Sequence, residues 1–273
     1  MSIFNWLKQQ LLKKTSHRYT LPELLWQQAL NKAVLLQTLT DDEQLRLSHL
    51  CAHFISKKKF TGVDGLHVSD EMKVLIAAQA CLLILELDFS YFDGWVEVVV
   101  YPAAFYVEHD VSDAAGVVSR QVQLLSGEAW SRGQVILSWQ DVLHDTLELH
   151  AGHQLVLHEF AHKLDARSGD TNGMPPLHKD MSREQWAQVL SHAYNHLLKQ
   201  LEHHHHGYIN AYAATNPAEY FAVLTEYFFT APVILKHHCE HVYHQLVKFY
   251  RQNPQHRALP HLENTQSSLK KHP

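Results

Sequence analysis

A short segment, His158-Glu159-Phe160-Ala161-His162, carries the residue types of a metal-dependent hydrolase. Histidines four residues apart leave the same face of a helix one turn apart, so both imidazoles can hold one ion. Glu159 points about 100° away from His158 around the helix, which suits it to reach a water on the metal instead of the metal itself. Zinc lowers the pKa of that water towards ~7, and a nearby carboxylate can accept its proton during attack on a carbonyl. The spacing predicts His158 and His162 as zinc ligands and Glu159 as the general base.

The surroundings of this motif favour function over coincidence. The chain has 24 histidines among 273 residues, so an accidental match to the pattern is commoner than usual. Apolar residues at helical spacing surround the motif, however, and indicate an amphipathic helix over residues 151–166. The β-like residues 134–139 precede it. A strand beside the metal helix is what a peptidase needs to align an extended substrate by strand addition.

A catalytic zinc ion takes three protein ligands and keeps one open position, so a third donor must come from elsewhere. Asp165 lies seven residues after His158, about 10.5 Å along a helix, which is too far for both to share one ion. We expect Asp165 to accept a hydrogen bond from a ligand imidazole or to contact the helix end. Position 168 is serine, which excludes the arrangement with a third histidine six residues after His162. The polar tract His203–His206 lacks a fixed geometry and is expected to bind metal only adventitiously.

Two glutamates in a later apolar helix, expected over residues 217–229, remain as candidates for the third ligand. Asn216 followed by Pro217 marks the start of that helix, and Glu219 occupies the capping-box position three residues after Asn216. A structural explanation for Glu219 is therefore available. Glu226 lies two turns further along the same face, where no capping box accounts for it. Spacing alone leaves the choice between Glu219 and Glu226 open.

The elements that must position these residues follow from the periodicity of the apolar residues. Helical spacing predicts two helices between residues 21 and 56, separated near Thr40, and a third over 69–87 with Ser69 as its N-cap. Strands are predicted at 95–101, 116–125 and 133–139, and helices at 151–166, 183–202, 217–229 and 235–251. This order predicts an α+β fold with helices packed on one face of a small mixed or antiparallel sheet. We expect a single domain over residues 1–263, with a helical part over about 1–90, and a polar, disordered tail over 264–273.

Composition narrows the class of protein further. The formal net charge of -5 gives no general attraction to nucleic acid. The three cysteines, Cys51, Cys81 and Cys239, are far apart and odd in number, which disfavours a disulfide framework. The most apolar segment, residues 74–87, is shorter than the ~20 residues of a membrane-spanning helix, and the N-terminus lacks the order of a secretory signal. These features favour a cytoplasmic protein.

Three segments, HEFAHKLD (158–165), TNPAEYFA (215–222) and VILSWQDVL (135–143), resemble the Mlc titration factor A family of bacterial cytoplasmic zinc peptidases. The resemblance extends from about residue 6 to residue 251, and the catalytic domain of anthrax lethal factor looks like a distant relative. It implies a zincin-like metallopeptidase fold that binds one Zn²⁺ through His158, His162 and Glu219. It also implies that Glu159 is the base and that Tyr212 lines the site, where its hydroxyl can donate a hydrogen bond to an oxyanion or protonate a leaving amine.

The resemblance also implies a function. It predicts a zinc peptidase that acts on peptide substrates with aminopeptidase character, in which Glu226 or Asp165 orients a ligand or meets the substrate. Members of the family also sequester a glucose-responsive transcriptional repressor, Mlc, and so relieve repression of sugar-uptake genes. The alternative is a non-catalytic protein that titrates the repressor and keeps a vestigial zinc site. The helix expected over 235–251 and the C-terminal tail are the candidate contacts with such a partner.

Overall fold

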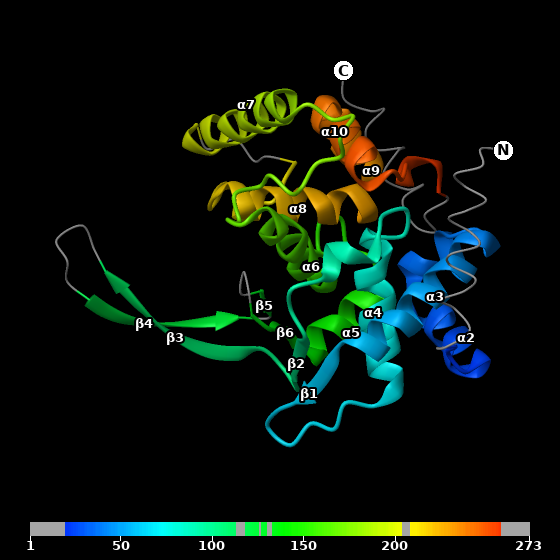
Figure 1. Ribbon diagram of the computed structural model, residues 1–273. Coiled ribbons are helices and arrows are strands. Elements are labelled where there is room, and N and C mark those ends of the chain that lie inside the picture. The colour runs from blue at the N-terminus through cyan, green and yellow to red at the C-terminus, as the bar shows by residue number, and fades with distance from the viewer. Residues whose placement is uncertain (1–19, 113–117, 126, 130–132, 204–207, 258–273) are drawn as a thin grey trace.

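A computed structural model describes residues 20–112, 118–125, 127–129, 133–203 and 208–257 (Figure 1). The tail expected over 264–273 and the histidines at 204–206 lie outside these residues. Helices dominate, and they lie above and to the right of a small sheet in Figure 1. Within the described part of the chain, none of the helices combines the length and the hydropathy that crossing a bilayer requires.

The sheet is mixed, as expected, and its strands lie in the order β1, β2, β6, β5. Three strands are parallel and the fourth, β5, runs antiparallel to β6. Their bounds are β1 (Lys59–Gly62), β2 (Glu97–Tyr101), β6 (Val135–Ser138) and β5 (Gly127–Ala129). A separate antiparallel pair, β3 (Phe105–Ser112) and β4 (Val118–Leu125), projects from the body of the molecule (Figure 1).

The position of β6 corrects one expectation. The residues expected to run beside the metal helix and to pair with substrate form an inner strand, because β2 and β5 take up its two edges. A strand that is paired on both sides has no free backbone groups to offer a peptide. Among the described residues the edge of the sheet on this side is β5, which packs against the helix that carries the HExxH motif.

The predicted helices form where capping signals mark their starts. Thr40 makes a full capping box with Glu43, and Ser69 accepts a hydrogen bond from the backbone N–H of Met72. These caps begin helices whose apolar faces enter the core. The helices before the sheet and in its first connection are α2 (Glu23–Lys32), α3 (Asp41–Lys57) and α4 (Asp70–Leu83), with 3-10 turns η1 (Val34–Thr38) and η2 (Phe89–Phe92).

The remaining helices follow β6. They are α5 (Trp139–Leu147), α6 (Leu155–Asp165), α7 (Arg183–Glu202), α8 (Pro217–Thr230), α9 (Pro232–His238) and α10 (Glu240–Tyr250), with 3-10 turns η3 (Ala166–Ser168), η4 (Ala211–Ala214) and η5 (Pro254–His256). The prediction for residues 183–202 is confirmed by α7. The single helix expected over 235–251 is wrong, because the chain breaks at Cys239, whose φ of -138° and ψ of 53° are not helical. Apolar spacing continues across this break and neither Gly nor Pro marks it, so the pattern could not reveal it.

Helix α6 lies at the centre of the molecule, between α8 on one side and α4 and the sheet on the other (Figure 1). Phe160 anchors it. The ring centroid of Phe160 lies 5.7 Å from that of Phe54, 5.3 Å from that of Phe92 and 5.6 Å from that of Trp95. The buried Lys163 also ties α6 to the start of β6, since its Nζ donates to the carbonyl of Gly133 at 2.8 Å. Helix α6 is thus fixed by aromatic packing and by a buried hydrogen bond.

We expect Phe160→Ala to lower the free energy of unfolding by about 3–5 kcal/mol, because it leaves a cavity among three aromatic rings. Chemical denaturation followed by circular dichroism measures this change. Leu45→Ala is the control, since Leu45 is 58% exposed and its loss should cost less than about 0.5 kcal/mol. Equal effects of the two substitutions would show that the aromatic cluster does not anchor α6.

Candidate metal centre

Three side chains from two helices converge on one point. The Nε2 atom of His158 lies 3.2 Å from Nε2 of His162 and 3.0 Å from Oε2 of Glu219. The distance from Nε2 of His162 to the same Glu219 oxygen is 3.3 Å. Donors of a tetrahedral zinc ion, at bond lengths of about 2.0–2.1 Å, lie roughly 3.3 Å from one another. The triangle of donor atoms therefore has the size that such an ion requires.

The second carboxylate of α8 orients one of these imidazoles. Oε1 of Glu226 lies 2.7 Å from Nδ1 of His158, and Glu226 is 5% exposed. When Nδ1–H donates to this carboxylate, the lone pair of a neutral imidazole resides on Nε2, which faces His162 and Glu219. Glu226 thus fixes both the ring position and the tautomer that a metal ligand needs. Of the two glutamates that spacing left open, Glu219 reaches the converging point and Glu226 lies behind His158.

The start of α6 is held in place by polar groups from three elements. Gln154 caps the helix, its side chain accepting from the N–H of Leu157 at 3.3 Å. Its own backbone N–H donates to Oε2 of Glu226 at 2.5 Å. Asp145 of the preceding helix α5 accepts a hydrogen bond from the N–H of Leu155 at 2.8 Å. These bonds satisfy N–H groups that have no partner inside the helix. The bond to Glu226 also holds the start of α6 against α8.

The first N–H groups of α8 also have hydrogen-bond partners. The side chain of Asn216 accepts from the N–H groups of Ala218 and Glu219, and Pro217 occupies the first turn. The predicted helix start is confirmed. The Glu219 carboxylate faces the two histidines. Its position three residues after the cap therefore serves to place it over α6.

Burial and charge act in opposite directions on these groups. Burial lowers the pKa of His158, but hydrogen bonds with Glu219 and Glu226 and the charges of Glu226 and Glu159 outweigh it and raise that pKa well above its usual value. Burial raises the pKa of Glu219, and hydrogen bonds and charges of His158 and His162 overcome this and hold it far below its usual value. The site is therefore strongly suited to a positive charge at the point where the three donors meet.

Glu159 and Tyr212 lie beside this point. Glu159 is 4% exposed, and its charge contributes to the raised pKa of both His158 and Tyr212. The ring of Tyr212 lies 6.0 Å from that of His158, and its N–H donates to Asn210 at 2.9 Å, which fixes the η4 turn that carries it. Burial, followed by the charges of Glu219 and Glu159, raises the pKa of the Tyr212 hydroxyl. Tyr212 consequently keeps its proton and can act as a hydrogen-bond donor.

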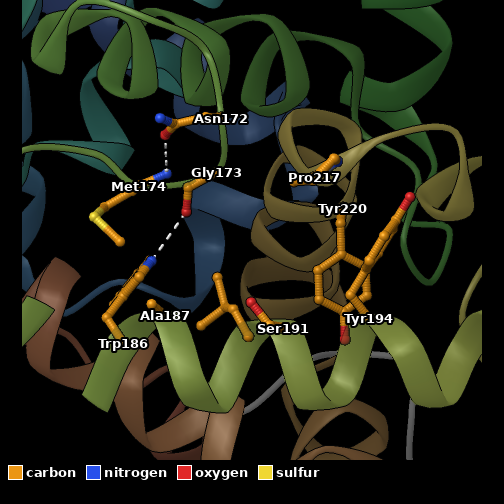
Figure 2. A pocket seen from close by; sticks show the side chains of 10 residues that line it. Asn172, Gly173, Met174, Trp186, Ala187, Ser191, Tyr194, Pro217 and Tyr220 are labelled. Carbon is orange, nitrogen blue, oxygen red and sulfur yellow. Dashed lines mark hydrogen bonds between the residues drawn. The ribbon is translucent and has the colours of Figure 1, made fainter. Parts of the chain in front are cut away.

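Asp165, at the end of α6, is fully buried and accepts a hydrogen bond from the N–H of Gly173 at 2.7 Å. Burial raises the pKa of Asp165 to about 6, against the opposing effects of that hydrogen bond and of the neighbouring His162. This hydrogen bond links Asp165 to the loop that follows α6. That loop is in turn held by Trp186, whose indole N–H donates to the carbonyl of Gly173 at 2.9 Å (Figure 2).

A cavity of about 100 Å³ lies between this loop, α7 and the first turn of α8 (Figure 2). None of the seven predicted site residues lines it. Gly173, with φ of 78°, approaches the carbonyl of Pro217 so closely that a Cβ atom would lie 2.6 Å from that oxygen. The loop therefore supports the turn that carries Glu219.

The carboxylate of Asp145 and the side chain of Gln154 were missed from sequence, although both fix the metal helix. Asp145 was missed because helix α5 was not predicted. The signal was present, since Ser138 followed three residues later by Asp141 is a helix start, and Ser138 does accept from the N–H of Asp141. For Gln154 no signal was available, because glutamine is not a preferred N-cap residue.

Catalytic zinc sites of metallopeptidases use histidine and carboxylate ligands with a carboxylate base nearby, and the side chains that converge here are of these types. The chain matches the family of glucose-regulated metallo-peptidases M90 over residues 4–251, and it belongs to that family. It is 37% identical over 252 residues to the Mlc titration factor A of Yersinia pestis strain Pestoides F, covering 91% of this chain and 90% of the relative. The protein of the same name from Yersinia pseudotuberculosis strain IP 31758 shows the same identity and coverage.

The two carboxylates of α8 should affect metal binding differently. We expect Glu219→Ala to lose zinc on dialysis, because one of the three donors is gone. Glu226→Gln should keep zinc but bind it 10–100-fold more weakly, since it removes the negative charge behind His158 and leaves all three donors in place. Zinc content by mass spectrometry and affinity by competition with a chelator measure both effects. Glu240→Gln, 62% exposed on its side chain, is the control and should behave as wild type. Zinc retained by Glu219→Ala but lost from Glu226→Ala would reverse the assignment.

Proposed function

We propose that this chain is a zinc-dependent peptidase in which His158, His162 and Glu219 hold the ion. The observation that carries the proposal is the triangle of donor atoms, with edges of 3.0, 3.2 and 3.3 Å. Its size fits zinc, its ligand types are those of catalytic zinc sites, and it belongs to a chain of a metallopeptidase family. A structural zinc site would instead use four Cys or His ligands and would have no base beside it.

The residues around the ion have separate tasks in the proposed reaction. A zinc ion held by His158, His162 and Glu219 would supply a Lewis acid that activates water for attack. Glu159 takes a proton from the attacking water and delivers it to the amine that leaves. The hydroxyl of Tyr212 donates a hydrogen bond to the oxygen of the carbonyl under attack, where negative charge develops. Glu226 keeps His158 in the tautomer that the ion requires.

The substrate of the proposed reaction is an extended peptide. Among the described residues β5 is the edge strand next to α6, and it is the element on which a substrate backbone can pair. Aminopeptidase selectivity needs an anionic group for the substrate ammonium. Glu226 and Asp165 are poor candidates for this role, since both are buried and each accepts a backbone N–H, from Gln154 and from Gly173. The proposal of aminopeptidase character follows from the resemblance to the family.

We further propose that the fold is zincin-like and forms one domain over residues 1–263. Support comes from the core, in which α3 and α4 of the N-terminal part share one buried apolar cluster with α6 and α8. The helical N-terminal part is thus continuous with the elements that carry the site.

A second function, binding of the Mlc repressor, is favoured by the name of the Yersinia relatives. Titration of a repressor requires binding and no hydrolysis, so the two functions can coexist in one chain or be exercised separately. Because a repressor acts on chromosomal DNA, this proposal also places the protein in the cytoplasm. A non-catalytic titration factor with a vestigial zinc site is the alternative to the peptidase.

Hydrolysis of amino-acyl anilides and of quenched, N-acetylated peptides tests the peptidase. Wild type is expected to hydrolyse at least one class, and Glu159→Gln to lose at least 100-fold in kcat while keeping zinc, because the proton acceptor is gone. Tyr212→Phe should lower kcat by roughly 100-fold and leave KM unchanged, since its hydrogen bond forms with the developing charge. Equal rates for wild type, Glu159→Gln and a chelator-treated sample would contradict the proposal that the chain is a peptidase.

A pull-down with purified Mlc tests the binding function. We expect wild type and Glu159→Gln to retain the repressor equally, because the substitution removes a proton acceptor from a buried site and leaves the surface unchanged. The repressor should also remain intact, as judged by electrophoresis. A failure of both proteins to retain Mlc would contradict the binding function and leave the peptidase untouched.

A further inference from the structure

A second group of metal-binding side chains lies on the surface at the end of α5. His144, Glu148 and His150 each offer a donor atom, and these atoms all lie within 4.8 Å of one another. The Oε2 atom of Glu148 is 3.8 Å from Nε2 of His144 and 3.4 Å from Nε2 of His150. All three side chains are accessible, with exposed fractions of 55%, 65% and 47%. Two imidazoles and a carboxylate form a ligand set that suits divalent zinc, nickel or copper.

The fold prepares this cluster in the same way as the first site. His144 presents Nε2 to the cluster, while its Nδ1 lies 3.5 Å from Oδ1 of Asp145, a carboxylate with no exposed side-chain surface. The same oxygen also lies 3.0 Å from Nδ1 of His153, so the carboxylate faces two imidazoles. A hydrogen bond from Nδ1 of His144 to this carboxylate leaves its Nε2 free to bind metal. Glu226 lies behind Nδ1 of His158 at the shorter distance of 2.7 Å.

The loop that carries His150 is held rigidly. His150 accepts a backbone hydrogen bond from His153 at 3.2 Å and forms a β-bridge with it. Gly152, between them, donates to the hydroxyl of Thr230 at 2.9 Å and adopts a φ of 67°, where a Cβ atom would overlap the ring of Tyr227. The backbone position of His150 is therefore set by contacts with α8.

We propose that His144, Glu148 and His150 form a second, exchangeable site for a divalent first-row transition metal. Its donors are separated by slightly more than the roughly 3.3 Å of a tetrahedral zinc site, so the exposed side chains close around the ion on binding. Asp145 links the site to the metal helix, since its other oxygen accepts from the N–H of Leu155 at 2.8 Å. An ion at the surface thus clips the end of α5 to the loop that leads into α6, and it stabilises that segment without entering the first site.

Zinc titration by calorimetry tests this site, in a full-length background in which the four histidines 203–206 are replaced by serine. This background removes the tract that binds metal adventitiously. We expect two equivalents of zinc to bind, the second more weakly and with a rise in Tm. His144→Ala combined with His150→Ala should abolish the second equivalent and its rise in Tm, and should leave the first equivalent in place. Glu148→Gln should weaken the second equivalent alone.

A matched control tests whether any pair of exposed histidines would bind the second equivalent of zinc. His192 and His196 lie four residues apart on the exposed face of α7. Replacing both by alanine should preserve both equivalents. Glu219→Ala should abolish the first equivalent and keep the second, so failure of the proposed catalytic centre is distinguishable from failure of this site. A second equivalent that survives His144→Ala with His150→Ala, or a titration that ends at one equivalent in the parent protein, would overturn the proposal.

Discussion

The interaction between His158 on α6 and two carboxylates on α8 governs the arrangement of the site. Glu219 and Glu226 lie seven residues apart, two helical turns, and they meet opposite nitrogens of one imidazole. Both contacts form together only when α6 and α8 have one particular axial offset and one particular rotation relative to each other. Burying three ionisable groups here carries a desolvation cost that their mutual hydrogen bonds and charges must offset. A cation at the converging point would relieve that cost further.

Much of the surrounding structure holds α6 and α8 in this relative position. Phe160 packs on the opposite side of α6 among aromatic rings, while Asp145 and Gln154 bind the N–H groups at its start. On α8, Asn216 caps the first turn and Gly173 supports it from behind. These contacts are polar at the helix ends and apolar along the helix sides. They leave little freedom at the donor atoms, which favours binding of an ion without rearrangement.

Sequence predicted best those features that depend on local chemistry. The HExxH spacing placed His158 and His162 together because helical geometry is the same everywhere, and the caps at Thr40, Ser69 and Asn216 marked true helix starts. Features that depend on distant contacts were beyond it. Only tertiary packing distinguishes Glu219 from Glu226, makes β6 an inner strand, or breaks the helix at Cys239. Family resemblance, not spacing, indicated Glu219 in advance.

The most direct measurement is anomalous diffraction at the zinc edge from crystals of the purified protein. The structure predicts a zinc peak bonded to Nε2 of His158, Nε2 of His162 and an oxygen of Glu219, at about 2.0–2.2 Å from each. Glu226 should remain hydrogen-bonded to Nδ1 of His158, outside bonding distance of the ion. A peak bonded to Glu226 in place of Glu219, or no peak between the two histidines of zinc-loaded protein, would contradict the central claim.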